Sequence, residues 1–297
     1  MSPPRLVVMD WGVGGFGAYA LLRAACPRLD VVYLSDAGFT PYGRAPRAAL
    51  RARLAWAAAV TGAGELLIAC NAACSALEPP PAPSALTPAP SALTPAPPEP
   101  PLALPPHLGV LRAGIELTRE AAARALAERA GAQGGGARVR VGVVGGHATV
   151  RSGAYERALA APGVEVTSRA AQPISAHVEA GRLSGEELHR DLREICAPLR
   201  GVDLLALACT HYPAARAAWA AHLPETLLLD PATRLVAEAV GAWGLAARGG
   251  EGRLEVLTTG DPAALRAAAL AAFGVRVGAV ARLPLDPPPL APLPLAP

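Results

Sequence analysis

The chain contains 297 residues, of which 52% are hydrophobic and 17% are charged. This length is typical of about two domains, and the apolar content is sufficient for buried cores and argues against global disorder. The formal net charge is only +3, and the scattered arginines form no basic patch of the kind that binds nucleic acid. The absence of lysine excludes enzymes that hold pyridoxal phosphate as a lysine Schiff base and enzymes with a P-loop.

From the N-terminus onward, short apolar strands alternate with helices. Strands are expected at residues 5–10, 30–35, 65–70, 138–145, 164–168, 203–208, 226–230 and 254–260. Helices are expected at residues 16–25, 45–60, 115–130, 232–246 and 262–273, with further helices between the strands of the middle region. This alternation is typical of right-handed βαβ units, so we predict an α/β fold of mostly parallel sheets flanked by helices.

Two proline-rich segments interrupt this pattern. Residues 79–106 contain the heptad APSALTP twice, at 82–88 and 89–95, and the tail at 283–297 has a similar composition. Proline fixes φ and lacks an N–H donor, so neither segment suits a helix or a central strand. We expect both to be low-complexity surface chain without a role in activity, with peptide docking as the alternative.

The chain carries no sign of export or of membrane insertion. Its first ten residues lack the regions of a signal peptide, and no run of about 20 apolar residues suits a membrane span. An odd number of cysteines argues against a disulfide framework. These are Cys26, Cys70, Cys74, Cys196 and Cys209. We therefore expect a cytoplasmic protein with reduced thiols, in which Cys26, Cys74 and Cys196 are small buried hydrophobic residues.

Two cysteines stand at the ends of predicted strands, one in each α/β half. Cys70 follows the run ELLIA and Cys209 follows LLALA, and the polar residues Asn71 and Thr210 come directly after them. A helix N-terminus at such a position lowers the pKa of a thiol, and ligands of parallel sheets bind at the carboxyl ends of strands. We therefore predict a site with two reactive thiols in the cleft between two similar halves.

The same motifs could also belong to two other kinds of site. A zinc site would combine the two strand-end thiols with Cys74 and His211, but this ligand spacing is not common for zinc, so no metal is expected. The glycine loop at 12–15 lacks the G-x-G-x-x-G spacing of a dinucleotide site. We interpret it as a tight strand-to-helix turn, or as a loop that brings Asp10 and backbone amides to an anionic substrate.

Four motifs in this order resemble those of the glutamate racemases, in the aspartate/glutamate racemase family. DWGVGG at 10–15, PYG at 41–43, CNAAC at 70–74 and CTHYP at 209–213 are similar to the family's DSGVGG, PYG, CNTAS and CTHYP. The segments at 143–159, 178–181 and 257–262 also resemble family segments. The resemblance extends from about residue 6 to residue 279, apart from the proline-rich insertion.

The resemblance implies a cofactor-independent amino-acid racemase that interconverts L- and D-glutamate and supplies D-glutamate for peptidoglycan. Racemisation removes the α-proton from one face of the substrate and returns a proton to the other, so it needs two acid–base groups. By the match of motifs these are Cys70 and Cys209, with Asp10 assisting Cys70 and His211 assisting Cys209. The positions that match substrate-binding residues are Trp11, Tyr42, Gly43, Asn71, Ala72 and Thr210.

The expected fold has two pseudo-symmetric domains with the active site in the cleft between them. The first comprises residues 1–108 and 214–282, and the second residues 109–213. The expected partner is a small amino-acid substrate, with neither nucleic acid nor membrane, and the family suggests a possible homodimer. Glu179 lies in a segment similar to one near the family's site, and the alternative is a surface charge.

The chain departs from the family motifs beside the first thiol. Trp11 replaces the serine of DSGVGG, and Ala72 and Cys74 replace the threonine and serine of CNTAS. Losing such hydroxyls costs roughly a few kcal/mol where they would bond a polar substrate. Trp11 either points into the cleft, which makes the pocket smaller or more apolar, or packs against the sheet. Besides glutamate racemisation, two alternatives therefore stay open: a racemase of another amino acid, and a ligand-binding relative with little or no catalysis.

Overall fold

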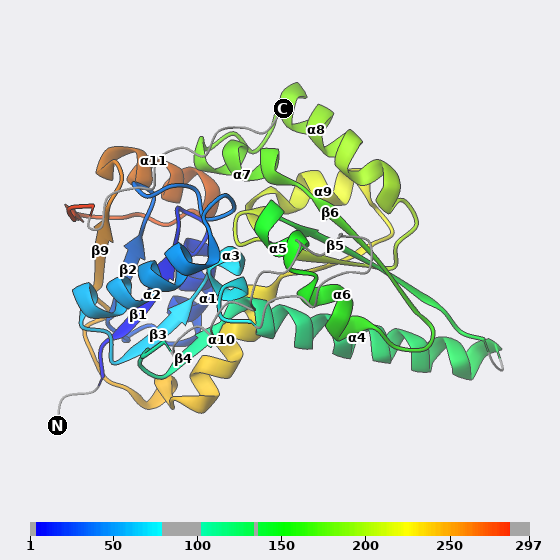
Figure 1. The fold of residues 1–297 in the computed structure, drawn as a ribbon, viewed down its shortest axis with the longest axis horizontal. Coiled ribbons are helices and arrows are strands. Elements are labelled where there is room, and N and C mark those ends of the chain that lie inside the picture. Colours follow the sequence, from blue (N-terminus) through cyan, green and yellow to red (C-terminus); the bar gives the residue numbers. More distant parts are fainter. Residues whose placement is uncertain (1–3, 79–101, 134–135, 286–297) are drawn as a thin grey trace, which may run out of the picture.

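Two parallel sheets flanked by helices form the protein, as a computed structural model shows for residues 4–78, 102–133 and 136–285 (Figure 1). The first sheet has six strands in the order β10-β9-β2-β1-β3-β4, and the second has four in the order β6-β5-β7-β8. Every strand pair in both sheets is parallel. The predicted α/β fold class is confirmed. The heptads at 82–95 and most of the tail lie outside the described residues.

The first half of the chain builds most of the first sheet, and the middle builds the second. The strands are β1 (Leu6–Asp10), β2 (Val31–Ser35), β3 (Glu65–Ile68), β4 (His107–Gly109), β5 (Val139–Gly145), β6 (Val164–Ala170), β7 (Leu204–Ala208), β8 (Leu227–Leu229), β9 (Leu254–Thr258) and β10 (Val280–Arg282). The helices are α1 (Phe16–Ala25), α2 (Arg47–Thr61), α3 (Asn71–Ser75), α4 (Val110–Gln133), α5 (His147–Ser152), α6 (Ala154–Leu159), α7 (Gln172–Glu179), α8 (Glu186–Cys196), α9 (Arg216–His222), α10 (Pro231–Ala242) and α11 (Pro262–Phe273).

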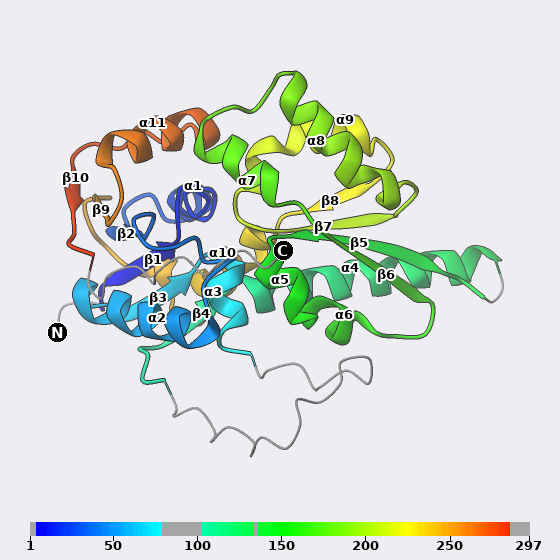
Figure 2. The same cartoon turned by 45° about the horizontal axis from the view of Figure 1, so that its top comes forward.

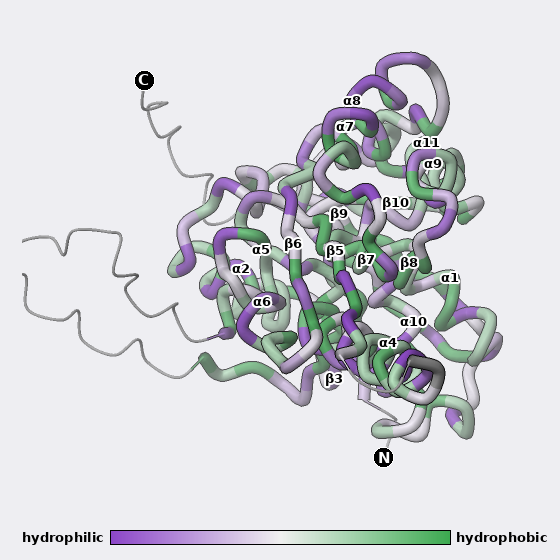
Figure 3. Tube along the Cα trace, turned by 90° about the vertical axis from the view of Figure 1, so that its right-hand side faces the viewer, coloured by the Kyte–Doolittle hydropathy of each residue, from purple (hydrophilic) through white to green (hydrophobic). Residues whose placement is uncertain are grey.

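Burial explains the strand pattern. Every residue of β1, β2, β3 and β7 is buried, as expected for the inner strands of parallel sheets that helices cover on both faces. The edge strand β6 instead alternates between half-buried and exposed residues. In Figure 3 the hydrophobic residues gather where the strands lie, whereas α8 is largely hydrophilic.

Local sequence signals set several helix ends. Asp230 and Asp261 cap α10 and α11, because their carboxylates accept hydrogen bonds from the backbone N–H groups of Ala232 and Ala263. A proline follows each aspartate, where the fixed φ suits the first helical turn. Helix α2 ends at Gly62, whose φ of 60° lies in the left-handed region.

The chain passes from one sheet to the other twice. It leaves the first sheet through β4 and the long helix α4, and it returns from β8 through α10, which packs against α4 (Figure 2). Because β8 pairs with β7, the second sheet extends to residue 229, beyond residue 213, where we expected the second domain to end. The expected division into domains stays a prediction. Among the described residues, no helix is both long enough and apolar enough to span a membrane.

Candidate active site

The carboxyl ends of the two sheets border one cavity of about 820 Å³. From the first sheet, β1 ends at Asp10, and Cys70 follows two residues after the end of β3, at the start of α3. From the second sheet, Cys209 follows directly after β7. All ten residues predicted from the sequence line this cavity: Asp10, Trp11, Tyr42, Gly43, Cys70, Asn71, Ala72, Cys209, Thr210 and His211. The structure thus brings two thiols from different halves of the chain to one cavity.

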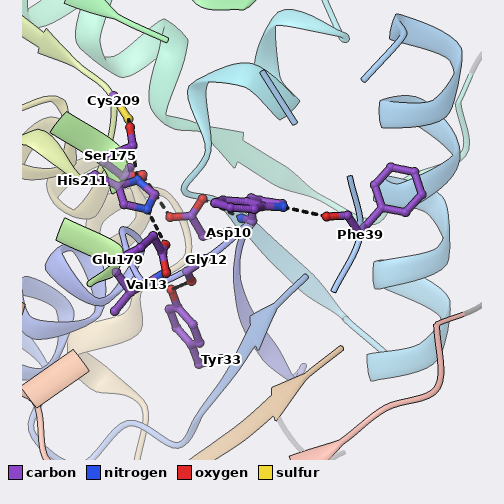
Figure 4. A network of polar contacts seen from close by, with 11 residues as sticks. Asp10, Gly12, Val13, Tyr33, Phe39, Ser175, Glu179, Cys209 and His211 are labelled. Atoms are coloured by element: carbon purple, nitrogen blue, oxygen red, sulfur yellow. Dashed lines mark hydrogen bonds and ion pairs between the residues drawn. The ribbon is translucent and has the colours of Figure 1, made fainter. Parts of the chain in front are cut away.

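The thiol of Cys209 lies beside two groups that can donate hydrogen bonds. Its Sγ is 3.6 Å from Nδ1 of His211 and 3.6 Å from Oγ of Ser175 (Figure 4). On the other side of the imidazole, Nε2 of His211 lies 2.6 Å from Oε1 of Glu179. The same carboxylate oxygen accepts a hydrogen bond of 2.8 Å from the backbone N–H of Val13. Cys209, His211 and Glu179 therefore form a continuous chain of polar contacts.

The charged forms of His211 and Glu179 stabilise each other. Burial opposes protonation of His211, but the contacts with Cys209 and Glu179 outweigh it and raise the pKa of His211 well above 6.5. Burial would likewise raise the pKa of Glu179, but the hydrogen bond and charge of His211 lower that pKa below its ordinary value of 4.5. At neutral pH an imidazolium is thus held between a carboxylate and the Cys209 sulfur.

The thiol of Cys70 lies near a carboxylate, whereas that of Cys209 lies near an imidazolium. It is only 8% exposed, and burial followed by the charge of Asp10 raises the pKa of Cys70 well above its ordinary value of 9.0. Asp10 is completely buried and accepts hydrogen bonds from Oγ1 of Thr210 (3.0 Å) and from the backbone N–H of Trp11 (2.7 Å). Burial raises the pKa of Asp10, and the charge of His211 and these two hydrogen bonds partly offset that rise. The surroundings of Cys70 favour the neutral thiol.

Asn71 carries two polar atoms that hydrogen-bond to no other described residue. The residue is 3% exposed and lines the cavity, yet neither its Nδ2 nor its Oδ1 has a partner in the described part of the chain. Buried polar groups are normally hydrogen-bonded, and an unpaired one costs about 1–3 kcal/mol. A carboxamide left unpaired beside an open cavity has a donor and an acceptor free to hydrogen-bond a ligand.

Trp11 lines the cavity and is held by the first half of the chain. Its indole N–H donates a hydrogen bond of 3.1 Å to the carbonyl oxygen of Phe39, and its side chain packs against the core. The indole therefore forms part of the cavity wall without filling the cavity. It faces the cleft, as in the first orientation predicted from the sequence, and it also packs against the core, which is close to the second.

Tyr42 is fixed by a buried ion pair behind the cavity. Its hydroxyl donates to Oδ2 of Asp36 at 2.7 Å, and Arg53 contacts both oxygens of the same carboxylate at 2.8 and 2.6 Å. Asp36 and Arg53 are both completely buried. Because the Tyr42 hydroxyl points to Asp36, its contribution to the cavity comes from its ring and backbone.

The glycine loop after β1 lets the two halves approach closely. A Cβ atom at Gly14 would stand 2.5 Å from Oγ1 of Thr210 and 2.7 Å from Nδ1 of His211. At Gly12 it would stand within 3 Å of the Glu179 carboxylate. The loop packs against Asp10, Thr210 and His211. Both interpretations of it, a tight strand-to-helix turn and a loop that brings Asp10 and backbone amides to an anionic substrate, stay predictions.

Several cavity residues were not predicted from the sequence. Helix α7 contributes Gln172, Ser175 and Glu179, of which only Glu179 was considered. The spacing of three and four residues would have placed these polar side chains on one helix face, opposite the buried Ile174 and Val178. The lining also includes Arg44, His147 and Thr149. Among the described residues, no group of three or more His, Cys, Asp or Glu side chains is arranged to hold a metal ion.

The two parallel sheets place this chain in the α/β class, and their carboxyl ends bring two thiols to one cavity, the candidate active site. The chain is 35% identical to a glutamate racemase of Thermus thermophilus over 298 residues, which cover 96% of this chain and 99% of the relative. It is 32% identical to that of Beutenbergia cavernae, covering 89% of this chain and 87% of the relative. No model of a protein family matches the chain.

Solved structures agree with these relatives. The glutamate racemase of Thermus thermophilus, in complex with β-chloro-D-alanine, superposes with a TM-score of 0.68 at 32% identity, covering 95% of this chain and 98% of that one. The glutamate racemase of Francisella tularensis, in complex with D-glutamate, has a TM-score of 0.73 at 20% identity and covers 96% and 99%. The chain belongs to the glutamate racemase family, and it is an isomerase.

Proposed function

We propose that this enzyme interconverts L- and D-glutamate without a cofactor, with Cys70 and Cys209 as the two acid–base groups. The observation that supports this most strongly is the single cavity that both thiols line, each carried by a different sheet. In one direction a thiolate removes the α-proton from one face of the substrate, and the other thiol donates its proton to the opposite face of the resulting carbanion. Each turnover thus leaves the two sulfur atoms with exchanged protonation states.

The surroundings of the two thiols favour one resting form. Cys209 lies beside the His211 imidazolium, which stabilises negative charge on its sulfur. Cys70 lies beside the Asp10 carboxylate, which favours a protonated sulfur. We therefore assign the free enzyme as a Cys209 thiolate and a Cys70 thiol, with Glu179 holding the imidazolium in place.

Substrate binding is assigned to the residues around the thiols. The unpaired carboxamide of Asn71 and the backbone around Gly43 and Ala72 line the cavity beside Cys70, and Thr210 lines it beside Cys209. Hydrogen-bond donors there stabilise the charge that develops on the substrate carboxylate when the α-proton leaves. Glutamate as the substrate is supported by the similar glutamate racemase of Thermus thermophilus and by the D-glutamate complex of the Francisella tularensis enzyme.

The product D-glutamate would serve peptidoglycan synthesis, the role that the sequence resemblance implies. All five cysteines are free, which suits a reducing compartment such as the cytoplasm. A homodimer stays a prediction from the sequence.

Deuterium exchange at the α-carbon tests this proposal. The enzyme would be incubated in D₂O with L- or D-glutamate and then with a panel of other amino acids, and exchange and optical purity would be followed by NMR and chiral chromatography. We expect both enantiomers of glutamate to exchange and racemise. Cys70→Ala and Cys209→Ala should each abolish racemisation, whereas Cys196→Ala, at a buried position away from the cavity, should retain it.

Two results would contradict the proposal. Racemisation that persists in Cys70→Ala or Cys209→Ala would remove the two-thiol mechanism. Exchange with another amino acid but not with glutamate would show that the wall formed by Trp11 and Ala72 has changed the substrate.

A further inference from the structure

Ser175 stands beside the second thiol without a place in the chemistry described so far. Its hydroxyl oxygen is 3.6 Å from Sγ of Cys209, and the residue is 6% exposed and lines the cavity. Figure 4 shows Ser175 and His211 next to Cys209. The family motifs that identify the site do not include this serine.

Helix α7 holds Ser175 and Glu179 in a fixed relation. The two residues are four positions apart, so they lie one above the other on the same face of the helix. Glu179 reaches His211, and Ser175 reaches Cys209. On the other side of the helix, His177 fixes α7 to α8 through a contact of 2.8 Å between its Nε2 and Oδ2 of Asp191. One rigid helix therefore supports both the imidazole and the thiol.

Two neutral hydroxyl groups lie near Cys209, those of Ser175 and Tyr212. Burial and the charge of Cys209 raise the pKa of Tyr212 well above its ordinary value, so this phenol stays neutral. Its hydroxyl forms no hydrogen bond with another described residue, whereas that of Ser175 reaches the Cys209 sulfur.

Among the described residues, the titratable groups that interact with Cys209 are His211 and Tyr212 on its own segment and Cys70 from the first half. Glu179 on α7 and Asp10 from the first half act on it through His211. Of these, the His211 imidazolium is the cation. A thiolate has several lone pairs, and the Ser175 hydroxyl offers it a second hydrogen bond.

We propose that Ser175 is a positioning residue that donates a hydrogen bond to the Cys209 thiolate and holds its sulfur toward the substrate. The inference deepens the proposed function, on which it rests, by naming a second donor for one of its two bases. The serine exchanges no proton with the substrate. When Cys209 takes up the α-proton, the hydroxyl is released from donating and can accept a hydrogen bond instead.

Turnover rates alone cannot identify the thiol that Ser175 serves. The two enantiomers have equal free energy, so kcat/KM must change by the same factor in both directions whichever base is weakened. The reactivity of each thiol must therefore be measured separately. Iodoacetamide alkylates thiolates, and the labelled Cys70 and Cys209 peptides can be quantified by mass spectrometry across a pH series.

The test compares Ser175→Thr with Ser175→Val in the full-length enzyme. These side chains have nearly the same shape and differ by a hydroxyl, so any difference between the variants reports the hydrogen bond. In Ser175→Val we expect the alkylation midpoint of Cys209 to rise by about 0.5–1 pH unit and kcat/KM to fall about 3- to 10-fold, with the acid limb of its pH profile shifted in the same direction. Ser175→Thr should stay close to the wild-type midpoint.

Ser152→Ala serves as the control for removing a serine near the cavity, because the Ser152 hydroxyl bonds the backbone of α5 rather than a thiol. It should leave both midpoints unchanged. Equal Cys209 midpoints in the threonine and valine variants would overturn the proposal, as would a shift that appears at Cys70 instead. The alkylation readout does not require racemisation, so its result stands even if Cys209→Ala proves active and the proposed function fails.

Discussion

The five cysteines of this chain differ in the groups that surround them. Cys209 faces an imidazolium and a hydroxyl, whereas Cys70 is buried beside a carboxylate. Burial raises the pKa of Cys74 to about 12 and that of Cys196 to about 11, so these thiols stay protonated at neutral pH. A protein without disulfides can therefore keep several thiols buried and inert and still place another beside an imidazolium and a hydroxyl.

Asn71 illustrates a conflict between stability and ligand binding. Its carboxamide is buried without a partner in the described residues, which is unfavourable in the free enzyme. We expect Asn71→Leu, which has a similar volume, to leave the melting temperature unchanged or to raise it. The same substitution should raise KM for glutamate at least about tenfold, because a donor and an acceptor are lost from the cavity. A lower melting temperature with an unchanged KM would show that Asn71 is structural.

At the scale of elements, the glycine loop between β1 and α1 sets how closely the halves approach. A methyl group at Gly14 would stand within 3 Å of side-chain atoms of Asp10, Thr210 and His211. We expect Gly14→Ala to displace these groups and to lower kcat/KM about 100-fold. Gly241→Ala in α10 is the matched control, because nothing lies within 4 Å of its new methyl group, and it should stabilise the fold by about 0.5–1 kcal/mol. Similar activity losses in both variants would argue against the role given to the loop.

The longer strands and helices were predictable because each carries its own pattern. Strand β1 is a continuous apolar run, and α11 agrees with the prediction at both ends because Asp261 and Pro262 begin it and Gly274 ends it. The short strands β4 and β10 have no such pattern. They form because they pair with the edges of a sheet, β4 with β3 and β10 with β9, and pairing of this kind depends on the tertiary structure.

The candidate site was predictable where chemistry and strand ends coincide. The ten predicted residues line one cavity because parallel strands bring their carboxyl ends to the same edge. Ser175 and Gln172 were missed because they lie on a helix, where the face turned to the cavity depends on packing against α8, α11 and the turn at Tyr212–Ala215. The orientation of Trp11 depended in the same way on a contact with Phe39, 28 residues away.

At the scale of the whole molecule, three hydrogen bonds between described residues connect the two halves across the cavity. Thr210 donates to Asp10, Val13 donates to Glu179, and Arg151 donates to the backbone oxygen of Gly43 at 3.3 Å. The Glu179 contact also depends on charge, since the His211 imidazolium lies on the same carboxylate oxygen. The stability of the enzyme should therefore depend on pH through this pair.

The two pKa shifts determine whether the stability of the enzyme rises or falls with pH. The pKa of Glu179 is lowered on folding, so its contribution is present above about pH 4.5 and is lost as the pH falls through the folded value. The pKa of His211 is raised, so its contribution is present below about pH 6.5 and is lost as the pH rises through the folded value. We expect Glu179→Gln to reduce the free energy of unfolding by about 1–3 kcal/mol near pH 6, with a smaller difference at both extremes.

Chemical denaturation across a pH series would measure this difference. Glu165→Gln is the control, because Glu165 pairs with Arg138 at an exposed position, and its effect should stay below about 0.5 kcal/mol. A Glu179→Gln effect that does not vary with pH would show that the charge of Glu179 has no part in joining the halves.

The position of Trp11 also gives the enzyme an internal optical reporter. Of its four tryptophans, Trp11 is the one that lines the cavity, whereas Trp219 is wholly buried and Trp56 stacks under the guanidinium of Arg53. Indole fluorescence responds to the polarity around the ring, so an amino acid that enters the cavity should change the emission of Trp11 while the other signals stay constant. Titration by fluorescence would then measure how tightly each amino acid binds, independently of whether the thiols can turn it over.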